Sequence, residues 1–305
     1  MSTNIVTFYV QQYAKILNEL VQQKTSRLRK YCTEDKYVGQ AASPVEQVGA
    51  VAMQPVTQRY GPMQRVDAPT DRRWVYPSDY DLPQLFDNFD KLRLLIDPKG
   101  KFVKNAHNAA NRQYDDLIIA ALGGTAQTGV TGQNSIVLPA GEIVGVQQGA
   151  ASPTGLTVAK LRQAKLILEQ NEAFSDEEGD PGDPTSGLVC VAGARQLDNL
   201  MAEAQVVSRD FNDSPVLEEG RVRRFLGITF VRSERLSTGT DDQAGTSTKV
   251  FVWQKEGMHL GVWNDISTNI SQRHDLQSEP WQAYVYMTAG ATRLEEKRVT
   301  QIWAR

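Results

Sequence analysis

Three histidines and two cysteines are the side chains in this sequence whose chemistry is most suited to metal binding or nucleophilic catalysis. His107, His259 and His274 stand alone, and none has a second histidine or cysteine at the spacing of a metal site. Cys32 and Cys190 are too few for a disulfide framework or a zinc knuckle. Cys190 lies in an apolar run, which indicates a small buried hydrophobic side chain. These five residues therefore predict neither a metal site nor a catalytic nucleophile.

Two loop-like segments resemble ligand-binding motifs only in part. A calcium-binding EF-hand loop starting at Asp176 would need glycine at position 181 and glutamate at position 187, where Pro181 and Gly187 stand. The stretch Gly124–Gly129 has the glycine spacing of a phosphate-binding loop, but Val130 replaces the lysine that would reach the phosphates. The sequence thus predicts no catalytic residue, no cofactor and no metal. An enzyme with an unrecognised site stays open as an alternative.

Composition and charge restrict the class of protein. The 305 residues include 33 basic and 36 acidic side chains, so the net charge is 33 − 36 = −3, which weighs against a free-standing DNA-binding protein. Hydrophobic residues make up 40%, enough for a packed core. No apolar run reaches the roughly 18 residues of a membrane span, so we expect no membrane association.

The first part of the chain looks like an arm. Residues 4–23 carry apolar side chains at spacings of three and four, which predicts an amphipathic helix that needs a surface to lie on. Residues 1–33 hold five basic groups and one acid, so the rest of the chain has 28 basic and 35 acidic groups. A basic arm on an acidic body indicates docking onto another copy or a partner. A solvated helix end is the alternative.

Residues 36–86 cannot form a long helix, because they contain six of the thirteen prolines. Short β-prone pieces between these prolines predict a long β-hairpin or extended loop. Its apolar density is too low for a core of its own. We therefore expect this segment, like the arm, to pack on something outside its own subunit.

A long helix is expected at residues 98–122, with Asp97 as its N-cap and Pro98 at its first position. Asp115 and Asp116 lie near its C-terminal end, where negative charge opposes the helix dipole. Either partner groups from elsewhere compensate these carboxylates, or their placement is chance.

The remaining pattern mixes helices and strands without regular alternation, which predicts the α+β class. A second helix is expected at 157–173, capped by Thr157, and a third at 194–205. Residues 237–248 look like a polar surface loop. Strands are expected at 136–138, 188–192, 216–224, 226–231, 250–254, 266–271, 281–288 and 299–303.

This order of parts resembles the major capsid proteins of tailed bacteriophages, which have the HK97-like fold. The parts follow one another as in that family. They are a basic arm, an extended β segment interrupted by prolines, a long helix that ends in Gly-Gly, and a C-terminal portion that is mainly β. Four stretches are similar to it: Asp115–Gly124 at the end of the long helix, Glu219–Val231 with its Leu-Gly-Ile strand, Phe251–Met258, and Thr288–Leu294.

The resemblance implies a division of the chain into the parts of an HK97-like subunit. The expected parts are an N-terminal arm (1–35), an E-loop (36–90), a peripheral domain (91–186) with spine helix 98–122 and second helix 157–173, an axial domain (187–280), and return strands of the peripheral domain (281–305).

The resemblance also implies a function and its partners. We expect a structural subunit, not an enzyme, that assembles with itself as hexamers and pentamers into an icosahedral shell. The shell would enclose double-stranded DNA, contacted without sequence specificity. Scaffolding, portal and decoration proteins are further candidate partners, and a scaffold would be a separate protein because no long segment precedes the arm. The subunit would assemble in the host cytoplasm and reside in the virion.

Arginine side chains are the candidates for contacts between subunits, because a planar guanidinium suits ion pairs across interfaces. The six proposed residues are Arg27, Arg29, Arg59, Arg65, Arg72 and Arg73. The alternative reading of the whole chain is the shell protein of a cellular nanocompartment, encapsulin-like, with the same fold.

Overall fold

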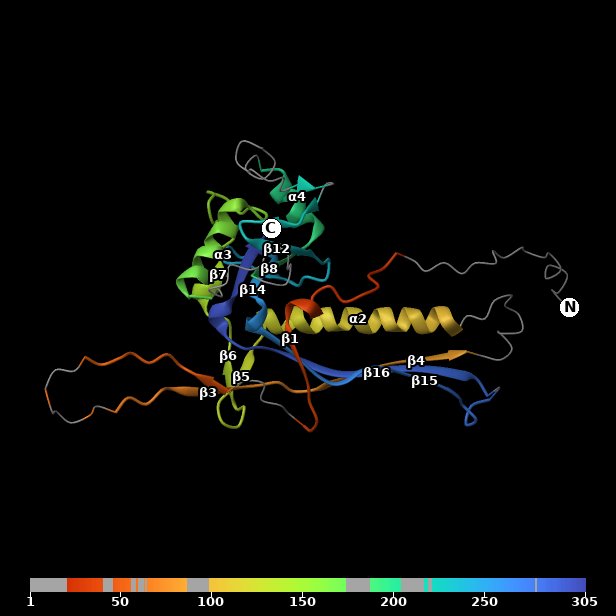
Figure 1. The fold of residues 1–305 in the computed structure, drawn as a ribbon. Coiled ribbons are helices and arrows are strands. Elements are labelled where there is room, and N and C mark those ends of the chain that lie inside the picture. The colour runs from red at the N-terminus through yellow and green to blue at the C-terminus, as the bar shows by residue number, and fades with distance from the viewer. Residues whose placement is uncertain are drawn as a thin grey trace. The chain divides into compact units, whose positions relative to one another are not determined.

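The computed structural model shows a chain of mixed α and β structure (Figure 1). It divides into two compact units. Unit 1 comprises Met1–Thr25, Asp79–Gln113 and Asn264–Thr288, and unit 2 comprises Ser26–Ser78, Tyr114–Trp263 and Ala289–Arg305. The structure describes residues 21–40, 46–55, 59, 63, 65–86, 99–173, 187–203, 217–218, 221–277 and 279–305.

Membrane spans are not found in the described part of the chain, because none of its helices combines the length and apolarity needed to cross a bilayer.

The long helix is α2, Lys99–Gly123, with 25 residues. Its expected N-cap and first residue, Asp97 and Pro98, lie outside the described residues. Side chains four apart form its buried face in unit 2 because they lie on one side of an α-helix. These side chains are Tyr114, Ile118 and Leu122.

Arg293 closes the C-terminal end of α2. Its side chain is fully buried, and its Nη1 donates to the carbonyls of Leu122 and Gly124 at 2.9 Å each. Its Nη2 donates to the carbonyl of Ile136 at 3.2 Å, and Glu296 lies 3.6 Å from its Nε. Because the last carbonyls of a helix have no partners within the helix, this buried guanidinium supplies the donors that they need.

The largest sheet lies in unit 2 and has the order β11-β12-β8-β14-β17-β7, with β13 paired to β14. β8 pairs parallel with β12 and antiparallel with β14. All five of its residues are buried, which explains the continuous apolar run in the sequence. The bounds are β7 Ile143–Val144, β8 Leu188–Ala192, β11 Arg224–Phe225, β12 Ile228–Arg232, β13 Thr238–Thr240, β14 Thr246–Gln254 and β17 Val299–Ala304.

Two shorter helices belong to unit 2. α3, Val158–Gln170, begins after Thr157, whose side chain accepts a hydrogen bond from the backbone N–H of Lys160, and it ends three residues before the expected 173. α4, Ala194–Met201, ends before Ala202, short of the expected 205. α3 packs on the large sheet, and the shared core includes Leu161, Ala164, Leu168, Cys190, Val252 and Ile302.

A buried lysine ties α3 to the end of the chain. The Nζ atom of Lys160 donates to the carbonyls of Thr154 at 2.7 Å, Gly155 at 2.9 Å and Trp303 at 2.8 Å. Burial lowers the pKa of Lys160 to about 8. The three carbonyls satisfy the three donors of the ammonium group, so the charge is kept inside the fold.

A second sheet has the order β1-β15-β16-β4. β15 and β16 are longer than the strands expected at 266–271 and 281–288, and they contribute residues to both units. In unit 1, alternate side chains of β16 are buried: Ala283, Val285 and Met287. The bounds are β1 Thr33–Lys36, β4 Ser78–Phe86, β15 Met258–Gln272 and β16 Trp281–Arg293.

A third sheet in unit 2 has the order β2-β3-β5-β6. Its bounds are β2 Glu46–Val48, β3 Thr70–Trp74, β5 Ala126–Thr128 and β6 Asn134–Ile136. The remaining elements are the pair β9 Leu217–Glu218 and β10 Arg221–Val222, and the 3₁₀ turns Arg29–Tyr31, Ala140–Glu142, Lys255–Gly257 and Glu296–Arg298.

The expectation of a polar surface loop at 237–248 is wrong, because β13 and the start of β14 form a hairpin there. Its turn is organised by Asp241, whose side chain is fully buried. The carboxylate accepts the backbone N–H groups of Gln243 at 3.0 Å and Gly245 at 2.8 Å, and also the Ser247 hydroxyl. Polar residues predict loops by composition, whereas these ones build a closed turn.

We predict that Arg293→Met lowers the free energy of unfolding by about 3–5 kcal/mol, because it leaves buried carbonyls without their donor and removes one of the two guanidinium groups next to Glu296. Urea denaturation of unassembled subunits measures this loss. The control Arg65→Met, at a side chain 86% exposed, should change stability by less than about 0.5 kcal/mol. A loss below about 1 kcal/mol in Arg293→Met would contradict the capping role.

Candidate assembly surfaces

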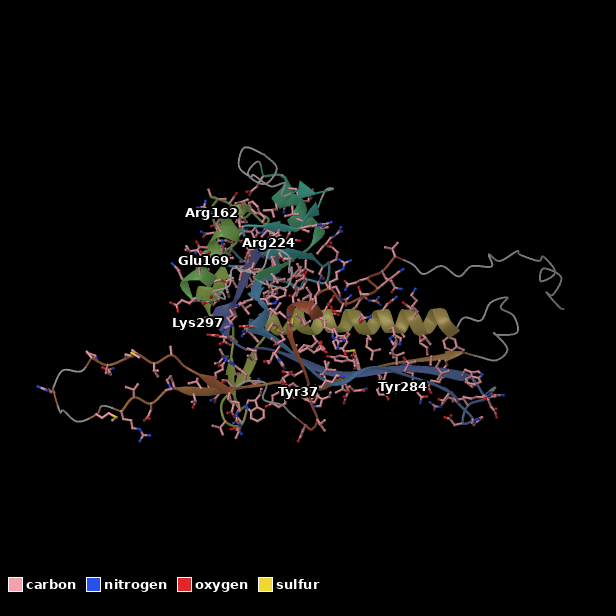
Figure 2. All side chains as sticks on the ribbon, viewed as in Figure 1. Tyr37, Arg162, Glu169, Arg224, Tyr284 and Lys297 are labelled. Carbon is pink, nitrogen blue, oxygen red and sulfur yellow. The ribbon has the colours of Figure 1, made fainter. Side chains whose placement is uncertain are left out.

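The segment from β2 to β3 is an extended hairpin that leaves the body of unit 2 (Figure 1). Its base is held by the pairing of Glu46–Val48 with Thr70–Arg72 and by a 2.7 Å hydrogen bond from Gly49 N to the carbonyl of Pro69. Figure 2 shows the described side chains beyond this base with no other described element of unit 2 beside them.

Apolar side chains on this hairpin are unburied. Val48, Val51, Met53, Met63 and Val66 are all exposed, and the two methionines are almost completely so. Exposed apolar groups that gather on one extension indicate an interaction surface, whereas scattered ones are ordinary. Burying one such side chain against a neighbour contributes about 1.5–3 kcal/mol.

Three of the six proposed contact arginines lie on this hairpin. Arg59 is exposed. Arg65 is 86% exposed and lies 3.0 Å from the carboxylate of Asp67. Arg72 forms an ion pair with Glu46 on the paired strand.

The other three arginines use their guanidinium groups within their own subunit. Arg27 donates to the carbonyl of Arg232 at 2.6 Å. Arg29 forms a two-point ion pair with Glu34. Arg73 is 4% exposed and donates to Glu296 at 2.5 Å.

The end of the arm also packs on its own subunit, which corrects the expectation that the whole arm needs a neighbour. Leu28, Tyr31 and Cys32 are buried. The indole N–H of Trp253 donates to the carbonyl of Tyr31 at 3.0 Å. Most of the helix expected at 4–23 lies outside the described residues, and residues 21–23 are not helical.

The anchor of the arm is Asp115 on α2, a residue whose role the sequence did not identify. Its carboxylate accepts the Ser26 hydroxyl at 2.6 Å and the backbone N–H groups of Arg27 and Leu28 at 3.1 Å each. The neighbouring Asp116 pairs with the guanidinium of Arg235. Both carboxylates that oppose the helix dipole thus have partners. Their unfavourable position near the C-terminal end of the helix was the feature of the sequence that could have indicated these partners.

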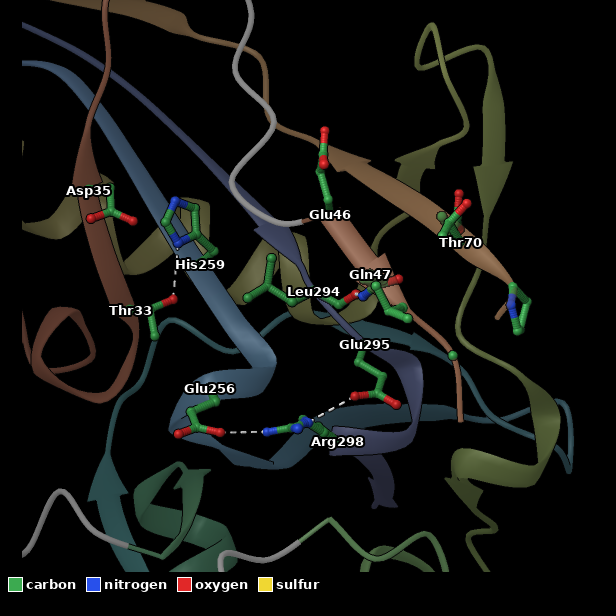
Figure 3. A pocket seen from close by; sticks show the side chains of 14 residues that line it. Thr33, Asp35, Glu46, Gln47, Thr70, Glu256, His259, Leu294, Glu295 and Arg298 are labelled. Carbon is green, nitrogen blue, oxygen red and sulfur yellow. Dashed lines mark hydrogen bonds and ion pairs between the residues drawn. The ribbon is translucent and has the colours of Figure 1, made fainter. Parts of the chain in front are cut away.

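A pocket of about 650 Å³ lies at the base of the hairpin in unit 2 (Figure 3). Its walls come from β1, β2, the start of β3, and the segment between β16 and β17. The lining is strongly acidic, with five carboxylates and one arginine. The charged residues are Asp35, Glu46, Asp71, Glu256, Glu295 and Arg298.

Arg298 neutralises one side of this pocket. Its Nη1 lies 2.7 Å from the carboxylate of Glu256, and its Nε lies 2.9 Å from that of Glu295. Asp71 accepts hydrogen bonds from the Thr128 hydroxyl and from the backbone N–H of Gly129. These bonds, the first of them most strongly, lower the pKa of Asp71. Negative charge is therefore stable in the pocket at neutral pH.

His259 forms a buried part of the pocket wall and joins β1 to β15. Thr33 gives its single hydroxyl proton to the carbonyl of Met258 at 3.0 Å, so the Nδ1–H of His259 donates to Thr33 Oγ1. Nε2 lies 2.9 Å from the Tyr37 hydroxyl, which also hydrogen-bonds Asp35. Burial lowers the pKa of His259, partly offset by Asp35 and Glu34. Burial therefore favours the neutral ring.

The described residues were compared with the two kinds of site that the sequence raised, a metal site and a reactive thiol. Among the described residues, no three His, Cys, Asp or Glu side chains are grouped to hold a metal ion. Burial raises the pKa of both Cys32 and Cys190, which keeps these thiols protonated and unreactive. What the described part offers instead is an unburied hairpin and an acidic pocket beside it.

Comparison with protein families matches residues 5–304 to the phage capsid protein family. The chain belongs to this family of phage capsid proteins.

Solved structures agree with the family match on the fold. The chain is similar to the capsid of cyanophage Pam1, with TM-score 0.73, 13% identity, and coverage of 100% of this chain and 97% of that one. It is also similar to the capsid of Ralstonia phage GP4, with TM-score 0.70, 13% identity, and coverage of 100% of this chain and 99% of that one. The match to the capsid of cyanophage P-SCSP1u has TM-score 0.70, 15% identity, and coverage of 100% of this chain and 95% of that one. No curated protein sequence matches the chain significantly.

The capsid protein therefore has the α+β, HK97-like fold that the order of its parts suggested. It is a major capsid structural subunit and a component of the virion. The match does not favour the alternative of a cellular nanocompartment shell.

We predict that Met53→Asp in the capsid protein impairs assembly without impairing folding. The fully exposed side chain supports no intramolecular packing, so the free energy of unfolding should change by less than about 0.5 kcal/mol. Loss of one apolar contact per subunit should weaken association about tenfold or more. Sedimentation of assembled particles and denaturation of unassembled subunits measure the two effects. Normal particle yield would show that Met53 is not at an interface.

We predict that the stability of the capsid protein falls as pH drops below about 6.5, because unfolding frees His259 to bind a proton that the folded state disfavours. The contribution of His259 to the free energy of unfolding is fully present above that pH, and it declines as the pH falls toward the lower pKa of His259 in the folded state. Denaturation at about pH 7.5 and about pH 5.5 measures it. In His259→Gln, this component of the pH dependence should disappear; an unchanged difference would refute the assignment.

Proposed function

We propose that this capsid protein assembles with itself, as hexamers and pentamers, into an icosahedral shell that encloses double-stranded DNA. The observation that carries the proposal is the hairpin with unburied Val51, Met53, Met63 and Val66. An isolated two-stranded hairpin is marginally stable in water, and neighbouring copies would cover its apolar side chains. Obligate interfaces of this kind commonly bury more than about 2,000 Å².

The proposal assigns a part of the shell subunit to each segment of the chain. Residues 1–35 are the arm, 36–90 the E-loop, 91–186 with 281–305 the peripheral domain, and 187–280 the axial domain. The hairpin supports the second assignment, and α2 and α3 support the third. The two compact units do not follow these bounds, since unit 1 groups Asp79–Gln113 with Asn264–Thr288.

Contacts between subunits are proposed for the hairpin arginines. Arg59 and Arg65 are exposed, and Arg72 lies at the hairpin base. Arg27 is also exposed, which suits a second, smaller role at an interface. Arg29 and Arg73 pair with Glu34 and Glu296 of their own subunit and are the least exposed of the six, with 25% and 4% of their side chains accessible, so we do not extend the proposal to them.

Further partners follow from the proposed shell. A portal complex, a separate scaffolding protein and decoration proteins would act on copies of this subunit, and packaged DNA would be contacted without sequence specificity. The net charge of −3 suits a wall that holds DNA without binding it tightly. Assembly would take place in the host cytoplasm.

Electron microscopy of the expressed protein, alone and with the products of neighbouring genes, tests the proposed function. We expect closed particles of uniform size, with nuclease-protected DNA where packaging proteins are supplied. Monomers under every condition would overturn the proposal. Particles that hold protein cargo and no nucleic acid would instead support a cellular container.

A further inference from the structure

We propose that the acidic pocket at the base of the hairpin receives the hairpin of a second copy, with Arg65 directed to Asp35 and Glu46. This inference rests on the proposed self-assembly and names its receiving site. The two carboxylates come from different walls of the pocket, Asp35 from β1 and Glu46 from β2 (Figure 3).

The charge of the pocket calls for a cation. Counting its lining, five carboxylates and one guanidinium leave a net charge of 1 − 5 = −4 with His259 neutral. Arg298 is engaged by Glu256 and Glu295, and Asp71 is held by hydrogen bonds to β5 and the turn after it. Asp35 and Glu46 are exposed, and Glu46 also forms an ion pair with Arg72 of its own copy. An incoming guanidinium would meet Asp35 first and would share Glu46 with Arg72.

The shape of the pocket favours an extended segment. β1 is the terminal strand of the order β1-β15-β16-β4, and β2 is the terminal strand of β2-β3-β5-β6. Both strands line the pocket. Terminal strands carry backbone groups on their outer side that can pair with an added strand. The pocket is therefore flanked by two sheet edges, as a site for a strand-like ligand would be.

The hairpin of another copy has the matching properties. Between β2 and β3 the sequence contains two basic side chains, Arg59 and Arg65, against one acid, Asp67, whose carboxylate lies 3.0 Å from Arg65. Val51, Met53, Met63 and Val66 on it are exposed. Because Arg65 lies on the hairpin and the receiver lies at the hairpin base, each copy gives one contact and accepts one. Such a head-to-tail contact forms a closed ring of identical copies when the rotation between neighbours closes.

A second pocket, of about 200 Å³ in unit 1, is the rival receiving site. It is lined mainly by small and apolar side chains of α2, β4 and β16, including Ala109 and Val285. The methionines of a neighbouring hairpin could enter it without any role for charge. Arg65 would then contribute nothing to assembly, which separates the two receiving sites experimentally.

Charge reversal tests the proposal in the full-length protein. Arg65→Glu should lower the fraction of subunits in particles at least about tenfold, because two like charges then meet in the contact. Adding Asp35→Lys to Arg65→Glu should restore most of that loss. The matched control is Arg162→Glu on the exposed face of α3, which should assemble normally. Unimpaired assembly of Arg65→Glu, or no rescue by the second change, would overturn the inference.

Disulfide trapping locates the contact. Tagged Met63→Cys subunits are mixed with untagged Val48→Cys subunits, so that a tagged-to-untagged bond forms only between copies; the native Cys32 and Cys190 are buried. We expect this pair to cross-link and the pair Met63→Cys with Ala109→Cys to remain unlinked. The reverse result would move the receiving site to the pocket in unit 1. Failure of the wild-type protein to form particles would instead count against the proposed function.

Discussion

The buried carboxylate of Asp115 is the interaction on which the placement of the N-terminal part depends. Loss of the Ser26 hydroxyl and the N–H groups of Arg27 and Leu28 would remove three donors from a charge inside unit 2, which is costly in a protein interior. Residues 26–28 are therefore held on α2. The chain then runs through Tyr31, held by the Trp253 indole, into β1, which pairs in register with β15. One wall of the acidic pocket thus owes its position to a carboxylate on a distant helix.

Unit 2 gives two of its buried cations partners from its own backbone, and the hairpin shows a different arrangement. Lys160 and Arg293 direct their donors at backbone carbonyls of loops and chain ends, so they fasten these segments to the core. The hairpin has only the short β2–β3 ladder and exposed side chains beyond it. These contacts stabilise the body of unit 2 within one subunit, whereas the exposed side chains of the hairpin are available for contacts with another molecule.

Local signals made some elements predictable from the sequence and left others hidden. The strand at 188–192 and the helix over 99–123 follow from an uninterrupted apolar run and from regular helical spacing that ends in Gly-Gly. The length of β15 could not be predicted: the sequence indicated a strand at 266–271, within the exposed second half of β15, whereas the strand begins at Met258 and its buried first half pairs non-locally with β1. The same holds for the candidate surfaces: proline content indicated the hairpin, whereas the acidic pocket joins Asp35, Glu46 and Glu295, which are far apart in the chain. Arg73 shows that residue type alone cannot identify a contact between subunits, since a buried and an exposed arginine look alike in the sequence.

A charged contact between hairpin and pocket has a property that a closed shell requires. Hexamers and pentamers of one chain demand that the same two surfaces meet at slightly different angles. Close-packed apolar surfaces tolerate such changes poorly, because small displacements open gaps. An ion pair between the flexible Arg65 side chain and carboxylates on two walls loses little when the angle shifts, since Coulomb attraction depends mainly on distance. In the proposed contact, the apolar side chains of the hairpin would supply affinity, and the charges would select the register in which the copies meet.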